Sequence, residues 1–184
     1  MDEIITPLTN ETPDYHSYDD MEESKALDCE RLSSQENPEY IKSLNHVDYY
    51  VDMSGISPEN TVAALNSFNE RVLLITGSDS VNDSSQASYD LLGPTLVNKA
   101  KHLILIGQTA GLIELSLMKR LTGKNKGIDL RITRCLTLRQ AADCAYLSAK
   151  PGDNVLLSPA GNQFINYDSI EELKESFDKY VTDT

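Results

Sequence analysis

Five residues at the ends of apolar segments have types and positions suited to binding a ligand. Gly77 and Ser78 follow one apolar run, Gly107 ends another, and Ser158 and Asn162 lie at and after the end of a third. If these runs are parallel strands, the five residues lie at the carboxyl edge of a sheet, where doubly wound domains bind ligands and helix N-termini attract anions. A small-anion or nucleotide site at this edge is one interpretation. The simpler alternative, which we favour, is that the glycines provide tight turns and close packing of strand against helix.

Asp52 supplies a carboxylate at the end of another apolar segment. It could contact a ligand at the same edge. The alternative, which we favour, is that Asp52 caps the loop that leads to Ser57, because short acidic side chains form such turns with nearby backbone N–H groups.

Other site chemistries find little support in the sequence. His16, His46 and His102 are far apart along the chain, so we predict neither a metal site nor a catalytic histidine dyad. Ser158 precedes Pro159 and lacks the G-x-S-x-G pattern of a hydrolase nucleophile. We therefore predict no catalytic residue and no metal ligand.

Alternating strand and helix patterns must position these residues. Apolar runs predict strands at residues 46–53, 71–77, 102–107, 128–134 and 154–159, the fourth at or near a sheet edge because it alternates with polar residues. Helical spacing predicts helices at residues 58–68, 84–100 with an interruption at Gly93-Pro94, 109–123, 138–150 and 170–181, with N-caps at Ser57, Thr137 and Ser169. This order predicts a Rossmann-like three-layer α/β domain with a mostly parallel sheet.

The charge distribution divides the chain in two. Of the 29 acidic residues, twelve lie in the first forty positions, beside only Lys25 and Arg31. Such an acidic segment, poor in branched apolar residues, cannot offset its own ordering entropy. We expect residues 1–42 to form a disordered acidic tail and residues 43–184 to form the domain.

Composition also limits the compartment and the partners. The sequence has no apolar run long enough for a membrane helix and no signal-peptide pattern at the acidic N-terminus. Its three cysteines make no CxxC pair, which favours reduced thiols. No basic stripe is present for nucleic acid. We expect a cytoplasmic protein that binds neither nucleic acid nor membrane.

Several segments together resemble one known family. They are TVAALNSF (residues 61–68), HLILIGQTAGLIELSL (102–117) and LRQAADCAYLSAKPGDNVLLSPA (138–160), in unbroken order. The set resembles the C-terminal domain of the Mur ligases, in particular the D-glutamate-adding UDP-N-acetylmuramoylalanine ligases. The resemblance implies a domain that carries D-glutamate and closes over a separate ATP-binding domain, in a reaction that uses ATP and magnesium through an acyl phosphate.

The substrate positions implied by the resemblance are mostly substituted. Asp52 keeps the family's acid near the nucleotide ribose, but Ser54 replaces the lysine that pairs with glutamate and Ile56 replaces a hydrogen-bonding threonine. Gln163 replaces a serine and Ile170 a phenylalanine. Each lost charge-assisted hydrogen bond costs about 1.5–3 kcal/mol. We therefore expect a degraded D-glutamate site.

No phosphate-binding loop of the G-x-x-x-x-G-K-[ST] type occurs, and the nearest candidate, Gly123–Gly127, lacks the required spacing. We expect no cofactor for the isolated chain, and ATP with Mg²⁺ only where a partner supplies an ATPase domain. The isolated chain should then be inactive, and any activity with such a partner would be that of an ATP-dependent acid–amino-acid ligase.

Three functions remain open. The first, which we favour, is a non-catalytic accessory or binding module linked to peptidoglycan precursor synthesis. The second is the amino-acid-binding half of a two-chain ligase, in which Ser54, Gln163 and Asn166 form a polar pocket for a different acceptor. The third is a scaffold without a small ligand. The first two imply a protein partner, either a Mur-ligase-like ATPase chain or another cell-wall synthesis protein.

Overall fold

A six-stranded, mostly parallel sheet forms the centre of the part of the chain that the computed structural model describes, residues 37–79, 89–121, 129–164 and 166–183. The strand order is β1-β2-β6-β3-β4-β5, and only β1 runs antiparallel to its neighbour. The strands are β1 (Glu39–Leu44), β2 (Val47–Val51), β3 (Val72–Thr76), β4 (Ala100–Leu105), β5 (Arg131–Arg134) and β6 (Asn154–Leu157). The predicted α/β class is confirmed, and β5, within the alternating segment predicted at 128–134, is an edge strand.

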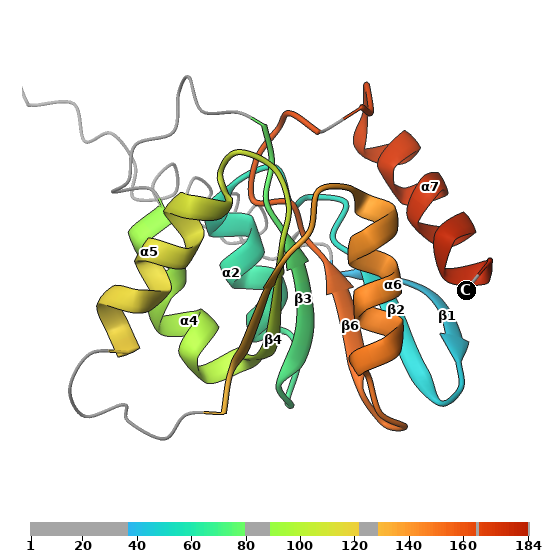
Figure 1. Ribbon diagram of the computed structural model, residues 1–184, viewed down its shortest axis with the longest axis horizontal. Coiled ribbons are helices and arrows are strands. Elements are labelled where there is room, and N and C mark those ends of the chain that lie inside the picture. The colour runs from blue at the N-terminus through green and yellow to red at the C-terminus, as the bar shows by residue number, and fades with distance from the viewer. Residues whose placement is uncertain (1–36, 80–88, 122–128, 165, 184) are drawn as a thin grey trace, which may run out of the picture. The chain divides into compact units, whose positions relative to one another are not determined.

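Helices cover both faces of the sheet (Figure 1). They are α2 (Pro58–Asn66), α4 (Leu92–Lys99), α5 (Ala110–Leu121), α6 (Leu138–Ser148) and α7 (Ile170–Thr182). One hydrophobic core lies under α6 and α7, with Leu138 and Phe177 fully or almost fully buried, and a second lies under α2, α4 and α5, with Leu65, Leu96 and Leu117 buried. The arrangement is the predicted three-layer one.

The predicted helix starts are confirmed at all three N-caps. The hydroxyl groups of Ser57, Thr137 and Ser169 accept hydrogen bonds from backbone N–H groups three residues further on. The predicted interruption at Gly93-Pro94 is displaced, because the turn falls at Leu91 and α4 begins at Leu92. Pro94 then lies in the first turn of α4, where its missing N–H group costs no helical hydrogen bond.

Strand β1 corrects the predicted domain boundary, because Glu39–Lys42, which the charge distribution places in the tail, belong to the sheet. The strand joins β2 through a two-residue hairpin in which Asn45 (φ 53°) and His46 (φ 62°) both have left-handed backbone conformations. Edge strands commonly carry charged residues, which is why this segment resembles a polar tail in sequence. The remaining predicted tail residues, 1–36, lie outside the described residues.

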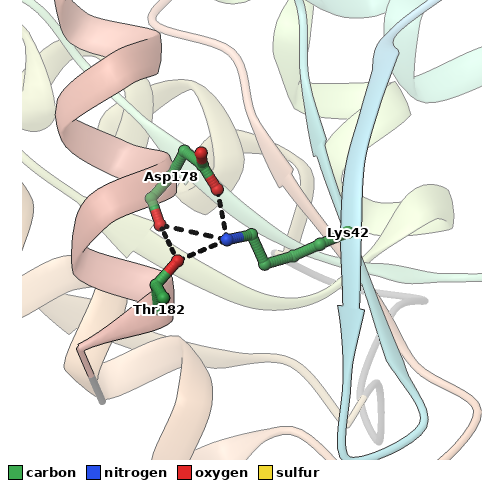
Figure 2. Close-up of polar contacts among 3 residues, drawn as sticks. All are labelled: Lys42, Asp178 and Thr182. Atoms are coloured by element: carbon green, nitrogen blue, oxygen red, sulfur yellow. Dashed lines mark hydrogen bonds and ion pairs between the residues drawn. The ribbon is translucent and has the colours of Figure 1, made fainter.

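Charged side chains connect β1 to α7 (Figure 2). The ammonium group of Lys42 contacts the Asp178 carboxylate, the Asp178 carbonyl oxygen and the Thr182 hydroxyl group. Lys174 of α7 also donates to Glu39 Oε1 at 2.5 Å. The charges of β1 thus hold the last helix against the edge of the sheet.

Candidate functional site

The carboxyl ends of β3 and β4 pack against each other at the two predicted glycines. A Cβ atom at Gly77 (φ 120°) would lie 1.9 Å from the carbonyl oxygen of Ile106, and one at Gly107 (φ 72°) would lie 2.6 Å from that of Ser78. A backbone hydrogen bond joins the same loops, since Thr109 N donates to Ser78 O at 3.0 Å, and Gly77 N donates to Pro159 O of the loop after β6, also at 3.0 Å. Close packing and left-handed turns therefore account for both glycines, while their contact with a ligand stays a prediction.

A carboxylate already lies at the start of α5. The backbone N–H of Gln108 donates to Asp79 Oδ1 at 3.3 Å, and the buried Ser78 donates its own N–H to Thr109 Oγ1 at 2.8 Å. A Cβ atom at Gly161 would lie 2.1 Å from Ser78 Oγ, so the loop after β6 also closes on Ser78. An anion at this helix N-terminus would have to compete with Asp79.

Asp52 forms a closed hydrogen-bond cluster at the end of β2. The side chain is fully buried, and its Oδ1 accepts from Ser54 N at 3.0 Å and Ser54 Oγ at 2.8 Å, while its Oδ2 accepts from Ser158 Oγ at 2.8 Å. Ser158 Oγ also lies 2.7 Å from Thr61 Oγ1, a hydroxyl pair in which either oxygen can be the donor. Each carboxylate oxygen thus has a partner inside the protein, as a buried charge requires.

Gly55 allows the loop after β2 to close over this carboxylate. A Cβ atom at position 55 would lie 2.8 Å from Ser158 Oγ and 2.9 Å from Asp52 Oδ2. The amide of Asn60 also donates to the Ser54 carbonyl oxygen. The loop from Asp52 to Ser57 is therefore folded down onto β6, a feature that sequence reasoning missed although the Ser54-Gly55 pair is typical of a tight turn.

The other predicted substrate positions lie outside this cluster. The Ile56 side chain is 50% exposed, Gln163 and Asn162 are exposed, and Ile170 is the first residue of α7 and half-buried. Gln163 contributes its carbonyl oxygen, which accepts from Asp79 N at 2.9 Å. Within the described ranges the Gln163 side chain makes no hydrogen bond to Asp52, Ser54 or Ser158, so the structure joins Asp52, Ser54 and Ser158 but not Gln163.

The loops at this edge carry no basic residue. Residues 52–57, 77–79, 107–109, 158–164 and 166–169 contain neither Lys nor Arg, while they contain Asp52, Asp79 and Asp168. Carboxylate ligands are bound most strongly by charge-assisted hydrogen bonds from cations. These loops lack the side chains that would supply such bonds to a dicarboxylate.

The two cysteines within the described ranges lie away from the Asp52 cluster, on the side of the sheet that α6 covers. Cys135 and Cys144 are free thiols, and burial, followed by the neighbouring Cys144, raises the pKa of Cys135 to about 11. Among the described residues, no three His, Cys, Asp or Glu side chains are grouped to hold a metal ion. No helix in the described ranges is both long and apolar enough to cross a membrane. The loop at Gly123–Gly127, Cys29 and His16 lie outside the described residues.

The comparisons with known proteins agree with this fold. No protein-family model matches the chain. Over 143 residues, the chain is 39% identical to the UDP-N-acetylmuramoylalanine--D-glutamate ligase of Acetivibrio thermocellus, a match that covers 78% of the chain and 30% of that ligase. The ligase of the same name from Ruminiclostridium cellulolyticum is 32% identical over 143 residues, which again cover 78% of the chain and 30% of that ligase. The chain thus spans about 30% of the length of these curated relatives.

A solved structure shows the same fold at low sequence identity. The structure of a UDP-N-acetylmuramoyl-L-alanyl-D-glutamate--2,6-diaminopimelate ligase matches with a TM-score of 0.50 and 16% identity, over 78% of this chain and 31% of that one. The described domain is therefore an α/β domain of the type found at the C-terminus of Mur ligases. The chain belongs to the family of Mur ligase C-terminal domains and is homologous over 143 residues to the UDP-N-acetylmuramoylalanine–D-glutamate ligases, which confirms the resemblance found in the sequence.

Proposed function

We propose that this domain is a non-catalytic accessory or binding module linked to peptidoglycan precursor synthesis. The observation that carries the proposal is the closed cluster at Asp52, whose carboxylate accepts hydrogen bonds from Ser54 and Ser158 and is fully buried. The relatives are named as D-glutamate ligases, and in this chain the corresponding loop is folded onto its own acid.

The energetics favour the closed loop over a bound dicarboxylate. Opening the loop would break hydrogen bonds to a charged group, each contributing about 1.5–3 kcal/mol. A glutamate ligand would then meet Asp52 and Asp79 without a Lys or Arg in the surrounding loops. Repulsion between the carboxylates of the ligand and those of the protein, with no cation to neutralise it, disfavours such a complex. We therefore expect this site not to bind D-glutamate.

A ligase assay tests this proposal directly. The full chain is incubated with UDP-N-acetylmuramoylalanine, D-glutamate, ATP and Mg²⁺, with the Acetivibrio thermocellus ligase as the positive control. We expect no product above the enzyme-free background and no saturable calorimetric signal with D-glutamate alone. Product formation by the isolated chain, or saturable binding of D-glutamate that Asp52→Asn abolishes, would overturn it.

A second candidate function is the amino-acid-binding half of a two-chain ligase. The identity with ligases over 143 residues favours it, because another chain would then supply the remainder of such an enzyme. The test adds this chain to the Acetivibrio thermocellus ligase truncated so that it lacks the matched segment. Restored product would establish the second function, whereas physical association without product would support the accessory module.

A further inference from the structure

A cationic cavity lies at the amino ends of the parallel strands, at the other end of the sheet from the Asp52 cluster. It has a volume of about 130 Å³ and opens between the amino ends of β4 and β5 and the carboxyl end of α6. The polar residues that line it are Lys101, His102, Asp129, Arg131, Ser148 and Lys150. At about 30 Å³ per water molecule, this volume corresponds to roughly four waters, which suits one phosphate or carboxylate group.

A β-bulge directs two neighbouring residues into this cavity. Val72 pairs with Ala100 and Leu73 pairs with His102, so Lys101 is an extra residue in β4 without a partner on β3. In a regular strand, consecutive side chains point to opposite faces, whereas here both Lys101 and His102 line the same cavity. Bulges commonly re-aim a side chain next to a functional site.

His102 forms a fixed neutral wall of the cavity. The Ser148 hydroxyl group donates to Cys144 O at 2.6 Å, so its oxygen accepts from His102 Nδ1 at 2.9 Å, and Thr133 Oγ1 then donates to Nε2 at 2.9 Å. Burial, and after it the nearby Arg131, lowers the pKa of His102 to about 4. The ring therefore adds no charge of its own near neutral pH, and the positive charge comes from Lys and Arg.

The cations of the cavity are only partly neutralised. Lys101 forms an ion pair with Asp153, which lies in the turn before β6. Arg131 and Lys150 have no ion-pair partner among the described residues, and Asp129 is the one acid in the lining. In a chain with a net charge of −13, a concave surface with this excess of cations is unusual.

We propose that this cavity binds a small molecule through a phosphate or carboxylate group. Arg131 and Lys150 supply the charge-assisted hydrogen bonds, and Lys101 shares its ammonium group between the ligand and Asp153. The site is independent of the Asp52 cluster, because the cavity lies at the amino ends of β4 and β5 whereas Asp52 follows the carboxyl end of β2. These strands run in the same direction in the sheet, whose arrangement Figure 1 shows. An oxyanion bound here would leave the proposed accessory function intact.

Titration with two probes tests the site. Inorganic phosphate and malonate are added separately to the full chain at constant ionic strength, and backbone amide and His102 ring resonances are followed by NMR. We expect saturable shifts at Lys101, His102, Arg131 and Lys150, with the tighter probe identifying a phosphate or carboxylate preference. Shifts that do not saturate, or that sodium chloride reproduces at equal ionic strength, would overturn the proposal.

Matched variants connect the shifts to the cavity. Arg131→Gln should weaken binding of the preferred probe by about tenfold, the change expected for losing roughly 1.4 kcal/mol. The control is Arg134→Gln, at the other end of β5, where the guanidinium contacts Glu114. Lys150→Gln, in an exposed turn, provides a second variant that does not depend on β5 folding normally. The site would be contradicted if Arg131→Gln and Lys150→Gln both bound the preferred probe with the affinity of the unmodified chain.

Discussion

Asp52 and Ser158, at the carboxyl ends of β2 and β6, share a buried hydrogen bond of 2.8 Å although they are 106 residues apart in the sequence. Ser158 Oγ also lies 2.7 Å from Thr61 Oγ1 of α2, so the serine contacts a helix as well as the neighbouring strand. One serine thus connects two neighbouring strands and a helix around a single carboxylate.

Removing the Ser158 hydroxyl group should therefore destabilise the domain. Ser158→Ala leaves Asp52 Oδ2 buried without its donor, and such an unsatisfied group costs about 1–3 kcal/mol. The free energy of unfolding from urea denaturation measures the loss. Ser43→Ala, at an exposed position of β1, is the control and should change stability by less than about 0.5 kcal/mol. Equal stability of both variants would contradict the structural role of the hydrogen bond.

Adding one methyl group at Gly55 should separate the loop from β6. Gly55→Ala places a Cβ atom 2.8 Å from Ser158 Oγ, and such overpacking costs about 1–3 kcal/mol. We expect a lower thermal midpoint and faster amide exchange at Ser54.

The matched control is Gly111→Ala in α5, where a Cβ atom would meet nothing within 4 Å. This variant should raise stability by about 0.5–1 kcal/mol, because alanine favours the helix over glycine. If Gly55→Ala were also stabilising, the loop would not be closed as described.

Lys42 should contribute to the docking of α7. Its replacement in Lys42→Met removes the contacts with Asp178 and Thr182 and should cost about 0.5–1 kcal/mol, since the groups are partly exposed. Hydrogen exchange should accelerate in β1 and in the last turns of α7, and the loss should shrink at high salt. Lys179→Met, an exposed position on the same helix, serves as the control. Unchanged exchange in α7 would show that Lys42 does not contribute to holding the helix.

His102 should make the domain less stable as the pH falls. Burial lowers its pKa from 6.5 to about 4, so between these values the unfolded chain binds more protons than the folded one. The stability contribution of the neutral ring is present above pH 6.5 and is lost as the pH falls toward 4, by up to about 3 kcal/mol at 1.36 kcal/mol per pKa unit.

Comparison of unfolding free energies at several pH values isolates this effect. His102→Gln should flatten the slope between pH 6.5 and 4, even if the variant is less stable at neutral pH. His46→Asn, at an exposed hairpin position that favours a left-handed conformation, should keep the slope. A slope that His102→Gln leaves unchanged would assign the pH dependence to the carboxylates.

The regular elements of the fold could be predicted because their signals are local. Ser57, Thr137 and Ser169 mark helix starts through bonds that span only three residues. Strand β1 was missed because its stability comes from β2 and α7, through Lys42 and its partners far along the chain, rather than from its own apolar pattern.

The site could be predicted only in part, for a similar reason. Asp52 was identified as a loop-capping acid, and the structure shows that role through Ser54. Its second partner, Ser158, and the tight fit of Gly55 depend on the close approach of β2 and β6, which no local pattern records. The bulge at Lys101 was likewise missed, since one extra residue in an apolar strand leaves the composition unchanged.

Lys101, the extra residue of the bulge in β4, is not needed for the alternation of side chains along that strand. Ala100 faces the core under α4 and His102 faces the side of α6, so these residues would alternate correctly even if Lys101 were deleted. Every other side chain of β4 would keep its face. We expect the β3–β4 ladder to close without the bulge while the cavity loses one of its cations, so Lys101 is an extra residue that contributes to the surface rather than to the core.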